Sequence, residues 1–270
     1  SDGERLERWG KYILVRPDPQ VIWNTPHVDP NWKNYDARYL RSNTGGGRWT
    51  DHDLPERWQI RYKDYLTFNV KPMNFKHTGV FPEQAANWNF IYDRIEELKL
   101  QTPMPKVLNL FAYTGGATLA AAASGAEVTH VDSVKQCISW ARENMEESRL
   151  EGIRWVVEDA LKFARREVKR GHRYEGIILD PPAYGRGPEG EKWVLEQHIS
   201  EMLALCAELL AEGCFLVLNL YSMGLSALLS RTALRQAFGS TGKEEAGELY
   251  FADRNGKELP LGTFCRFSRK

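Results

Sequence analysis

The 270-residue sequence lacks several features that mark specialised protein classes. Its 36 basic and 36 acidic residues cancel to a formal net charge of zero, so contact with nucleic acid requires a local basic patch. No apolar run reaches the roughly 18 residues that a membrane span needs, and the N-terminus has no apolar signal-peptide region. We therefore expect no membrane partner.

Cysteine is scarce and scattered. None of the four cysteines belongs to a C-x-x-C pair or lies near a histidine cluster, which argues against a structural zinc site. Isolated cysteines in a chain of this length are typical of a reducing cytosol, where most are buried thiols. The sequence therefore predicts no bound metal and a cytoplasmic location. The four cysteines are Cys137, Cys206, Cys214 and Cys265.

The N-terminal part of the chain differs in composition from the rest. Six of the nine tryptophans lie in about its first 100 residues, among many turn formers. Short apolar runs bounded by these turn formers predict strands. We expect them at 12–15, 57–62 and 65–70. The pattern indicates a small, mainly β domain over residues 1–80.

Strands and helices alternate in the remainder of the chain, residues 81–270. Apolar runs predict strands at 107–110, 127–131, 153–157, 176–179, 214–220, 245–251 and 264–268. Helical spacing of apolar residues predicts helices at 82–100, 117–124, 133–149, 160–170, 191–210 and 225–238. Continuous apolar strands separated by helices favour an α/β fold. We expect a doubly wound, seven-stranded, mostly parallel sheet covered on both faces.

Ligands of such sheets bind beyond the carboxyl ends of the strands, so the residues after each strand are the candidates for a site. The first strand leads into a loop whose glycines, Gly115 and Gly116, allow close backbone approach to a ligand. The helix after it offers free N–H groups to a carboxylate. The loop lacks the G-x-G-x-x-G fingerprint, so a simple strand-to-helix turn is an equal alternative.

Acidic residues follow the next three strands. Asp132 comes roughly 20 residues after the first strand, where an acid binds the ribose hydroxyls of a nucleoside cofactor or caps the following helix. Asp159 is placed to accept from an exocyclic adenine amine or to cap its own helix. Asp180 begins the stretch DPPAY, in which two prolines end strand pairing and hold a rigid turn.

The DPPAY turn is the strongest candidate for catalysis. A rigid turn aims the Asp180 carboxylate and nearby backbone carbonyls at a nucleophile, and Tyr184 is suited to stack on a base. A plain strand terminator is the alternative. The glycine-rich segment 185–190 that follows predicts a mobile lid.

Four stretches together resemble one known family. They are TGVFPEQ (78–84), NLFAYTGG (109–116), VDS (131–133) and LDPPAY (179–184). They look like successive motifs of the S-adenosylmethionine-dependent methyltransferases that modify large-subunit ribosomal RNA at cytosine C5 or guanine N7. The resemblance covers about residues 60–220 and implies S-adenosylmethionine as cofactor and ribosomal RNA as partner.

The resemblance also implies site residues. The implied cofactor-binding residues are Phe81, Gln84, Phe111, Ala112, Tyr113, Thr114, Gly115, Asp132, Ser133, Asp159, Ala160 and Asp180. The implied catalytic residues are Asp180, Pro181, Pro182 and Tyr184. Within this set, Phe81 and Gln84 would close over the methionine end of the cofactor. Their alternative roles are core packing and helix capping.

One departure from the family pattern bears on mechanism. Cytosine-C5 enzymes need a cysteine nucleophile, which the loop after the fifth strand should supply. That loop, 220–224, reads LYSMG, and Cys214 lies at the opposite end of the strand. The sequence therefore favours direct in-line transfer of the methyl group to a nitrogen, oxygen or carbon acceptor, with an amine or ring nitrogen as the best fit.

Other interpretations of the sequence remain. The basic stretch Arg165, Arg166, Lys169, Arg170 and Arg173 is either an RNA-binding patch or an ordinary solvated helix face. A methyltransferase for a small molecule or a protein, and a non-catalytic RNA-binding protein that keeps the cofactor fold, are both compatible with the motifs. The broken glycine fingerprint, the DPP turn and the terminal strand pair disfavour a nicotinamide-dependent dehydrogenase.

Overall fold

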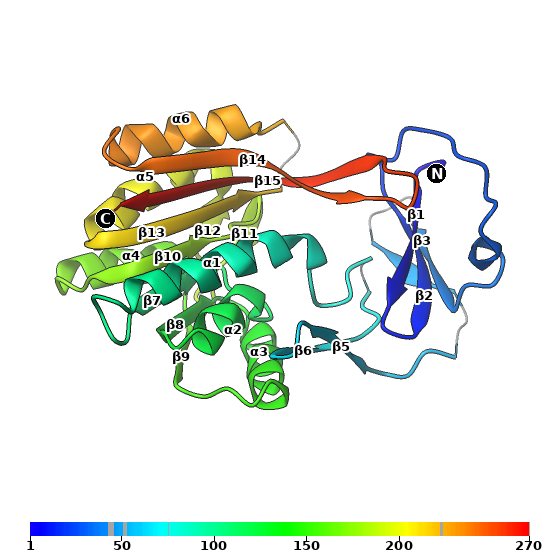
Figure 1. Cartoon of the computed structure of the whole chain (residues 1–270), viewed down its shortest axis with the longest axis horizontal. Helices are drawn as coiled ribbons and strands as arrows, with labels where there is room; N and C mark the ends of the chain where they lie inside the picture. The colour runs from blue at the N-terminus through cyan, green and yellow to red at the C-terminus, as the bar shows by residue number, and fades with distance from the viewer. Residues whose placement is uncertain (43–45, 51–52, 75, 222–223, 270) are drawn as a thin grey trace. The chain divides into compact units, whose positions relative to one another are not determined.

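A computed structural model describes residues 1–42, 46–50, 53–74, 76–221 and 224–269. The chain forms two compact units (Figure 1). The N-terminal unit consists of Ser1–Phe81 together with Ala252–Leu259, and the C-terminal unit of Pro82–Phe251 together with Pro260–Lys270. The tip of the terminal strand pair is therefore part of the N-terminal unit.

The N-terminal unit is mainly β, as the sequence predicts. One sheet has the strand order β1-β2-β3-β4, and β5 and β6 form a separate antiparallel hairpin. The strands are β1 (Glu4–Trp9), β2 (Tyr12–Pro17), β3 (Ala37–Arg41), β4 (Gly47–Trp49), β5 (Trp58–Tyr62) and β6 (Leu66–Val70), with a short 3-10 helix, η1 (Pro30–Trp32). The predicted strands correspond to β2, β5 and β6, whereas the sequence missed β1, β3 and β4.

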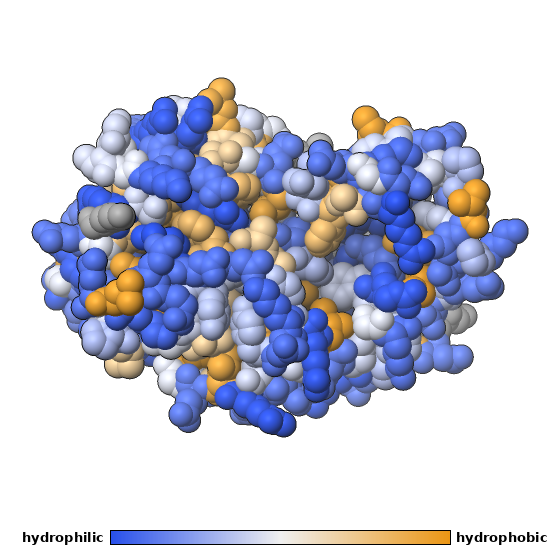
Figure 2. All heavy atoms as spheres, viewed as in Figure 1, coloured by the Kyte–Doolittle hydropathy of each residue, from blue (hydrophilic) through white to orange (hydrophobic). Residues whose placement is uncertain are grey.

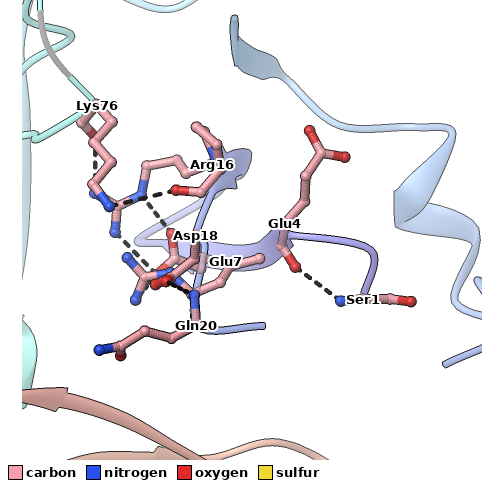
Figure 3. A network of polar contacts seen from close by, with 9 residues as sticks. Ser1, Glu4, Glu7, Arg16, Asp18, Gln20 and Lys76 are labelled. Atoms are coloured by element: carbon pink, nitrogen blue, oxygen red, sulfur yellow. Dashed lines mark hydrogen bonds and ion pairs between the residues drawn. The ribbon is translucent and has the colours of Figure 1, made fainter. Parts of the chain in front are cut away.

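Aromatic and ionic groups stabilise this unit together. Trp9 and Trp58 are buried, and the indole N–H of Trp58 donates to the Trp9 carbonyl over 2.9 Å. The buried Arg16 guanidinium lies 4.8 Å from the Trp9 ring and pairs through two nitrogens with Glu7. Figure 3 shows this guanidinium near Asp18, with a hydrogen bond to the Lys76 carbonyl. These tryptophans are therefore core residues.

The C-terminal unit is built on the predicted seven-stranded sheet, whose order is β14-β15-β13-β10-β7-β8-β9. Strands β13, β10, β7, β8 and β9 are parallel neighbours, and β15 runs antiparallel to β13. The bounds are β7 (Lys106–Leu110), β8 (Glu127–Asp132), β9 (Ile153–Val157), β10 (Tyr174–Leu179), β13 (Leu210–Leu220), β14 (Lys243–Ala252) and β15 (Glu258–Arg269). The predicted doubly wound α/β fold is confirmed.

Helices cover both faces of this sheet (Figure 1). They are α1 (Ala85–Leu98), α2 (Gly116–Ala123), α3 (Lys135–Glu147), α4 (Ala160–Lys169), α5 (Leu195–Leu209) and α6 (Ala227–Phe238), with a 3-10 turn, η2 (Pro82–Gln84), before α1. One apolar cluster joins α1 and α2 to one face, and a second joins α4, α5 and α6 to the other. Adjacent strand residues such as Ile177 and Ile178 enter opposite clusters, which explains the continuous apolar strands.

The helix predicted over 191–210 begins later than expected. Residues Lys192–Val194 form a short strand, β12, which pairs antiparallel with β11 (Tyr184–Arg186). The reason is tertiary, because Trp193 is buried against the core and holds its backbone extended. The predicted lid, 185–190, lies in the hairpin that connects these strands. Its mobility stays a prediction.

The face of the molecule drawn in Figure 2 is mainly hydrophilic. In the view of Figure 2, apolar residues appear as separate small patches among hydrophilic ones. None of the helices in the described ranges is long and apolar enough to cross a membrane. Across those same ranges, the structure contains no group of three or more His, Cys, Asp or Glu placed to hold a metal ion.

Candidate active site

The strand register brings the loops of interest to one edge of the sheet. Leu179 at the end of β10 pairs with Leu110 of β7 on one side and with Leu218 of β13 on the other. Leu110 in turn pairs with Val131 of β8. The glycine loop, Asp132 and Asp180 therefore leave the sheet at the same level, at its carboxyl edge.

The glycine loop after β7 is tightly curled. Phe111, Tyr113 and Gly115 have φ angles of 58°, 49° and 90°, in the left-handed region. For the two non-glycine residues this conformation costs on the order of 1 kcal/mol each, and such strain is common at functional sites. The Asn144 side-chain amide holds the loop by donating to the Thr114 carbonyl over 2.9 Å, and the Ala112 N–H donates to the Val131 carbonyl over 3.1 Å.

A side chain would be disfavoured at both glycines of this loop, at Gly116 by close packing and at Gly115 mainly by its positive φ. A Cβ on Gly116 would lie 2.7 Å from Cζ2 of Trp88, and one on Gly115 would lie 3.1 Å from Cβ of Ala141. Gly115 is the N-cap of α2 and has no side chain with which to cap the first N–H groups of the helix. The N-terminus of α2 therefore presents backbone donors and the positive end of the helix dipole at the sheet edge.

Asp132 is bound to backbone amides on both sides. Its Oδ2 accepts from the Tyr113 N–H and its Oδ1 from the Val134 N–H, each over 2.8 Å. Helix α3 begins at Lys135 with Val134 as its N-cap, so Asp132 is not the helix cap. Burial raises the pKa of Asp132, and the two amides oppose this effect. The half-buried Ser133 follows it.

Asp159 does cap a helix. Its Oδ1 accepts from the Lys162 N–H over 2.9 Å at the start of α4. The capping alternative from the sequence is therefore correct, and contact of the other carboxylate oxygen with an adenine amine stays a prediction. Ala160, the first residue of α4, is buried in the apolar cluster on this face.

Asp180 lies in an unusual electrostatic environment. Burial, with a smaller contribution from the neighbouring Glu83 carboxylate, raises its pKa from 3.8 to about 7. Burial penalises the charged form, and a like charge adds to that penalty. A carboxyl group with a pKa near neutrality can both accept and hold a proton at physiological pH, which suits general acid–base chemistry.

Trp193 connects the DPPAY turn to the glycine loop. Its indole N–H donates to the Pro182 carbonyl over 2.7 Å, and its ring centroid lies 4.7 Å from that of Phe111. The carbonyl of Pro182 thus already has a donor, while Pro181 is buried beside Asp180. Tyr184 is 54% exposed on β11, and its hydroxyl accepts from the Arg186 side chain over 3.2 Å. Its stacking role stays a prediction.

Two further predicted residues belong to different units. Gln84, in η2 of the C-terminal unit, is buried, and its side-chain amide donates to the Tyr221 hydroxyl over 2.6 Å. Phe81 is the last residue of the continuous part of the N-terminal unit, where its ring centroid lies 5.1 Å from that of His77. Contact of either residue with the cofactor stays a prediction.

The basic stretch on α4 is largely neutralised. Arg165 pairs with Glu201 at 2.6 Å, Arg166 with Glu158 at 2.5 Å, and Arg170 with Glu167 at 3.3 Å. These ion pairs favour the solvated helix face over an RNA-binding patch.

Several residues that hold the loops and strands around the candidate site carry no signal in the sequence. Trp193 falls in the stretch predicted as the helix 191–210, and Asn144, Asn87 and Arg266 lie inside regular elements without any motif. Their roles depend on contacts between distant parts of the chain, such as the hydrogen bond from Arg266 to Asn87. No local pattern signals contacts of this kind.

Comparison with known proteins places the chain among methyltransferases. The family model described as S-adenosylmethionine-dependent methyltransferase matches residues 35–251. The crystal structure of the SAM-dependent methyltransferase from Agrobacterium tumefaciens is 39% identical with a TM-score of 0.93, and the match covers 100% of this chain and 88% of that one. A chain named as a methyltransferase and complexed with SAH shares the fold at 20% identity and a TM-score of 0.75, over 98% of this chain and 71% of that one.

A curated relative carries a more specific name. The ribosomal RNA large subunit methyltransferase K/L of Shewanella frigidimarina is 29% identical over 170 residues. The match covers 62% of this chain but only 22% of that relative. This chain thus spans about a fifth of the length of the relative.

Proposed function

Because this chain belongs to the S-adenosylmethionine-dependent methyltransferases, we propose that it methylates a base of ribosomal RNA by direct in-line transfer. The RNA acceptor is supported by the name of the curated relative, of which this chain matches a part. The observation that carries the proposal is the meeting of the glycine loop, Asp132 and Asp180 at one edge of the sheet.

The donors and acceptors at this edge fit the cofactor. The N-terminus of α2 suits the carboxylate of the methionine part, and Asp132 suits the ribose hydroxyls, whose hydrogen bonds would favour its ionised form. The second oxygen of Asp159 suits the adenine amine. Gly115 and Gly116 let the backbone approach closely. When bound, the cofactor supplies a methyl group that is already activated by its sulfonium charge.

The chain contributes positioning and proton handling. We assign to Asp180 the task of orienting the acceptor and taking its proton, which matches a pKa near 7. Trp193 keeps the turn and the glycine loop in register through Pro182 and Phe111. Cys214 lies in the first half of β13, away from the carboxyl edge, so it cannot serve there as the nucleophile of a covalent C5 mechanism.

The test uses the full chain with radiolabelled S-adenosylmethionine and two acceptor pools, total RNA and a protein extract. We expect label in the RNA and a single methylated nucleoside by mass spectrometry after digestion. Label confined to the protein pool would refute the RNA acceptor. Thermal stabilisation by S-adenosylhomocysteine, and none by NAD(H), checks the cofactor separately.

The variant D180A tests the assigned role, with the surface variant E96Q on α1 as control. We expect D180A to bind S-adenosylhomocysteine as the wild type does while its turnover falls at least about a hundredfold. Full turnover by D180A would show that Asp180 does not handle the acceptor.

A further inference from the structure

The hairpin of β11 and β12, which continues the DPPAY turn, has two different faces. In its antiparallel pairing, Arg186 lies opposite Lys192 and Tyr184 lies opposite Val194. Because side chains of a strand alternate between the two faces, Tyr184, Arg186 and Lys192 share one face, and all three are exposed. The hydrogen bond of 3.2 Å from Arg186 Nε to the Tyr184 hydroxyl agrees with this placement. We call these three residues the outer face of the hairpin.

The hairpin is fastened to the residues beside Asp180. Trp193, which points to the opposite face, is buried and donates to a carbonyl of the DPPAY turn. The Leu195 N–H donates to the Ala183 carbonyl over 3.0 Å. Arg186 follows Asp180 by six residues, so their Cα atoms lie at most about 20 Å apart. The outer face is therefore within a few nucleotides of any base held at Asp180.

The acidic residues of the hairpin are turned away from the outer face. Glu189 and Glu191 both pair with the Lys162 ammonium of α4, at 2.5 and 3.5 Å. A Cβ on Gly187 would overlap the Glu191 carboxylate, so this carboxylate lies against the glycine. Since Glu191 directly precedes Lys192, the two side chains point to opposite sides. The hairpin thus separates its charges, with the acids toward α4 and the cations on the outer face.

The two cations of the outer face lack a counter-charge from the chain. Within the described ranges, neither Arg186 nor Lys192 pairs with a carboxylate, and Arg186 donates to the neutral Tyr184 phenol. Side chains directly opposite across a strand pair have Cβ atoms about 4.5–5.5 Å apart, and like charges there destabilise the pair. An anion bound on this face would relieve that repulsion. The basic stretch on α4 differs, because three of its arginines already have acidic partners.

We propose that the outer face binds the sugar–phosphate backbone of the RNA next to the methylated base, with Arg186 and Lys192 each on a phosphate. The proposal rests on the proposed function, in which the acceptor is an RNA base. A guanidinium binds a phosphate through two N–H donors, and an ammonium binds one as a point charge. The exposed Tyr184 ring favours nucleic acid over an acidic protein, because bases stack on aromatic rings. The outer face then holds the strand, while Asp180 handles the acceptor.

The double variant R186Q/K192Q tests the proposal in the full chain. Its affinity for a fluorescein-labelled, single-stranded oligouridylate is measured by anisotropy between about 50 and 200 mM salt. Loss of two phosphate contacts should lower the slope of log Kd against log salt concentration by about 1.4, and weaken binding about tenfold or more at about 100 mM. The dissociation constant of S-adenosylhomocysteine should stay within about twofold of wild type. The melting temperature should not fall, because a repulsion is removed.

The matched control is K169Q/R173Q, which removes the same charge at the other edge of the sheet. Lys169 ends α4 and Arg173 directly precedes β10, so both lie at the amino edge. We expect this control to keep the wild-type slope and affinity. With RNA as methyl acceptor, R186Q/K192Q should raise KM about tenfold at nearly constant kcat, since phosphate contacts position the strand.

Equal salt slopes in the wild type and R186Q/K192Q, or an equal loss of affinity in the control, would overturn the proposal. So would a variant that loses affinity for poly-glutamate but not for the oligouridylate, because the partner would then be an acidic protein. A lowered melting temperature in R186Q/K192Q would contradict the repulsion argument. The binding measurement uses no methyl transfer. Labelling of the protein pool alone, together with a changed slope, would therefore refute the RNA acceptor but not RNA binding by the hairpin.

Discussion

The electrostatic coupling of Glu83 to Asp180 leads to a prediction about the pH dependence of the variant E83Q. The pKa of Asp180 is raised from 3.8 to about 7, first by burial and second by the Glu83 carboxylate. The total shift corresponds to about 4 kcal/mol in favour of the protonated form. Because burial is the larger cause, we assign less than half of the shift to Glu83. Removing its charge should lower the Asp180 pKa by about 0.5–1 unit.

The pH profile of kcat/KM measures this change, since its acid limb reports the pKa of an essential base in the free enzyme. At pH 6, lowering the pKa from about 7 to about 6–6.5 raises the ionised fraction of Asp180 from roughly one tenth to roughly one quarter to one half. The rate of E83Q at pH 6 should therefore be about threefold to fivefold that of wild type, while the rates at pH 8.5 should agree.

E96Q is the matched control, because Glu96 lies on the exposed side of α1 and pairs with Lys99. Its acid limb should coincide with that of the wild type. An unchanged or upward-shifted acid limb in E83Q would refute the assigned coupling, and a profile without any limb near pH 7 would refute Asp180 as the base.

The remaining predictions concern stability and positioning. The folded-state pKa of Asp180 is raised, so the unfolding free energy of the ligand-free wild type should fall as pH rises from about 4 to 7. In denaturant titrations, D180N should make this fall smaller by about 1–2 kcal/mol. This is less than the full pKa shift corresponds to, because the side chain is partly solvated. W193F should lower the unfolding free energy by about 1 kcal/mol and lower kcat several-fold at nearly constant KM, because the hydrogen bond from the indole to the Pro182 carbonyl is lost. A kcat equal to that of the wild type would exclude a positioning role for Trp193. G116A should destabilise the chain by about 1–3 kcal/mol and weaken S-adenosylhomocysteine binding, because the new Cβ meets Trp88; unchanged calorimetric affinity would argue against a cofactor at this loop.

The sheet could be predicted from the sequence because its strands are continuous apolar runs and its helices keep a regular period. Residues such as Ile177 and Ile178 are both buried, on opposite faces, which is the pattern of a strand covered on two sides. The strands of the N-terminal unit were harder to predict. In β1 (Glu4–Trp9, ERLERW), charged residues come in adjacent pairs rather than alternating with apolar ones, and they form ion pairs such as Glu4 with Arg38, so the local signal for a strand is weak.

The candidate site was predictable only in part. Position after a strand singles out Asp132 and Asp180 as candidates, but it does not tell which of the alternative roles each residue has. The structure shows that Asp159 caps its helix and that Asp132 binds loop amides, which depends on backbone geometry. The contacts of Trp193 and Arg266 link strands and loops far apart in the chain, and no local pattern encodes them.

The most direct test of the account is a crystal structure of this chain with S-adenosylhomocysteine. We predict the ribose hydroxyls on the carboxylate of Asp132, the methionine carboxylate at the N-terminus of α2, and the sulfur facing Asp180. The nucleoside bound away from Asp132, or at a different edge of the sheet, would contradict the claim that the loops after β7, β8 and β10 form one site.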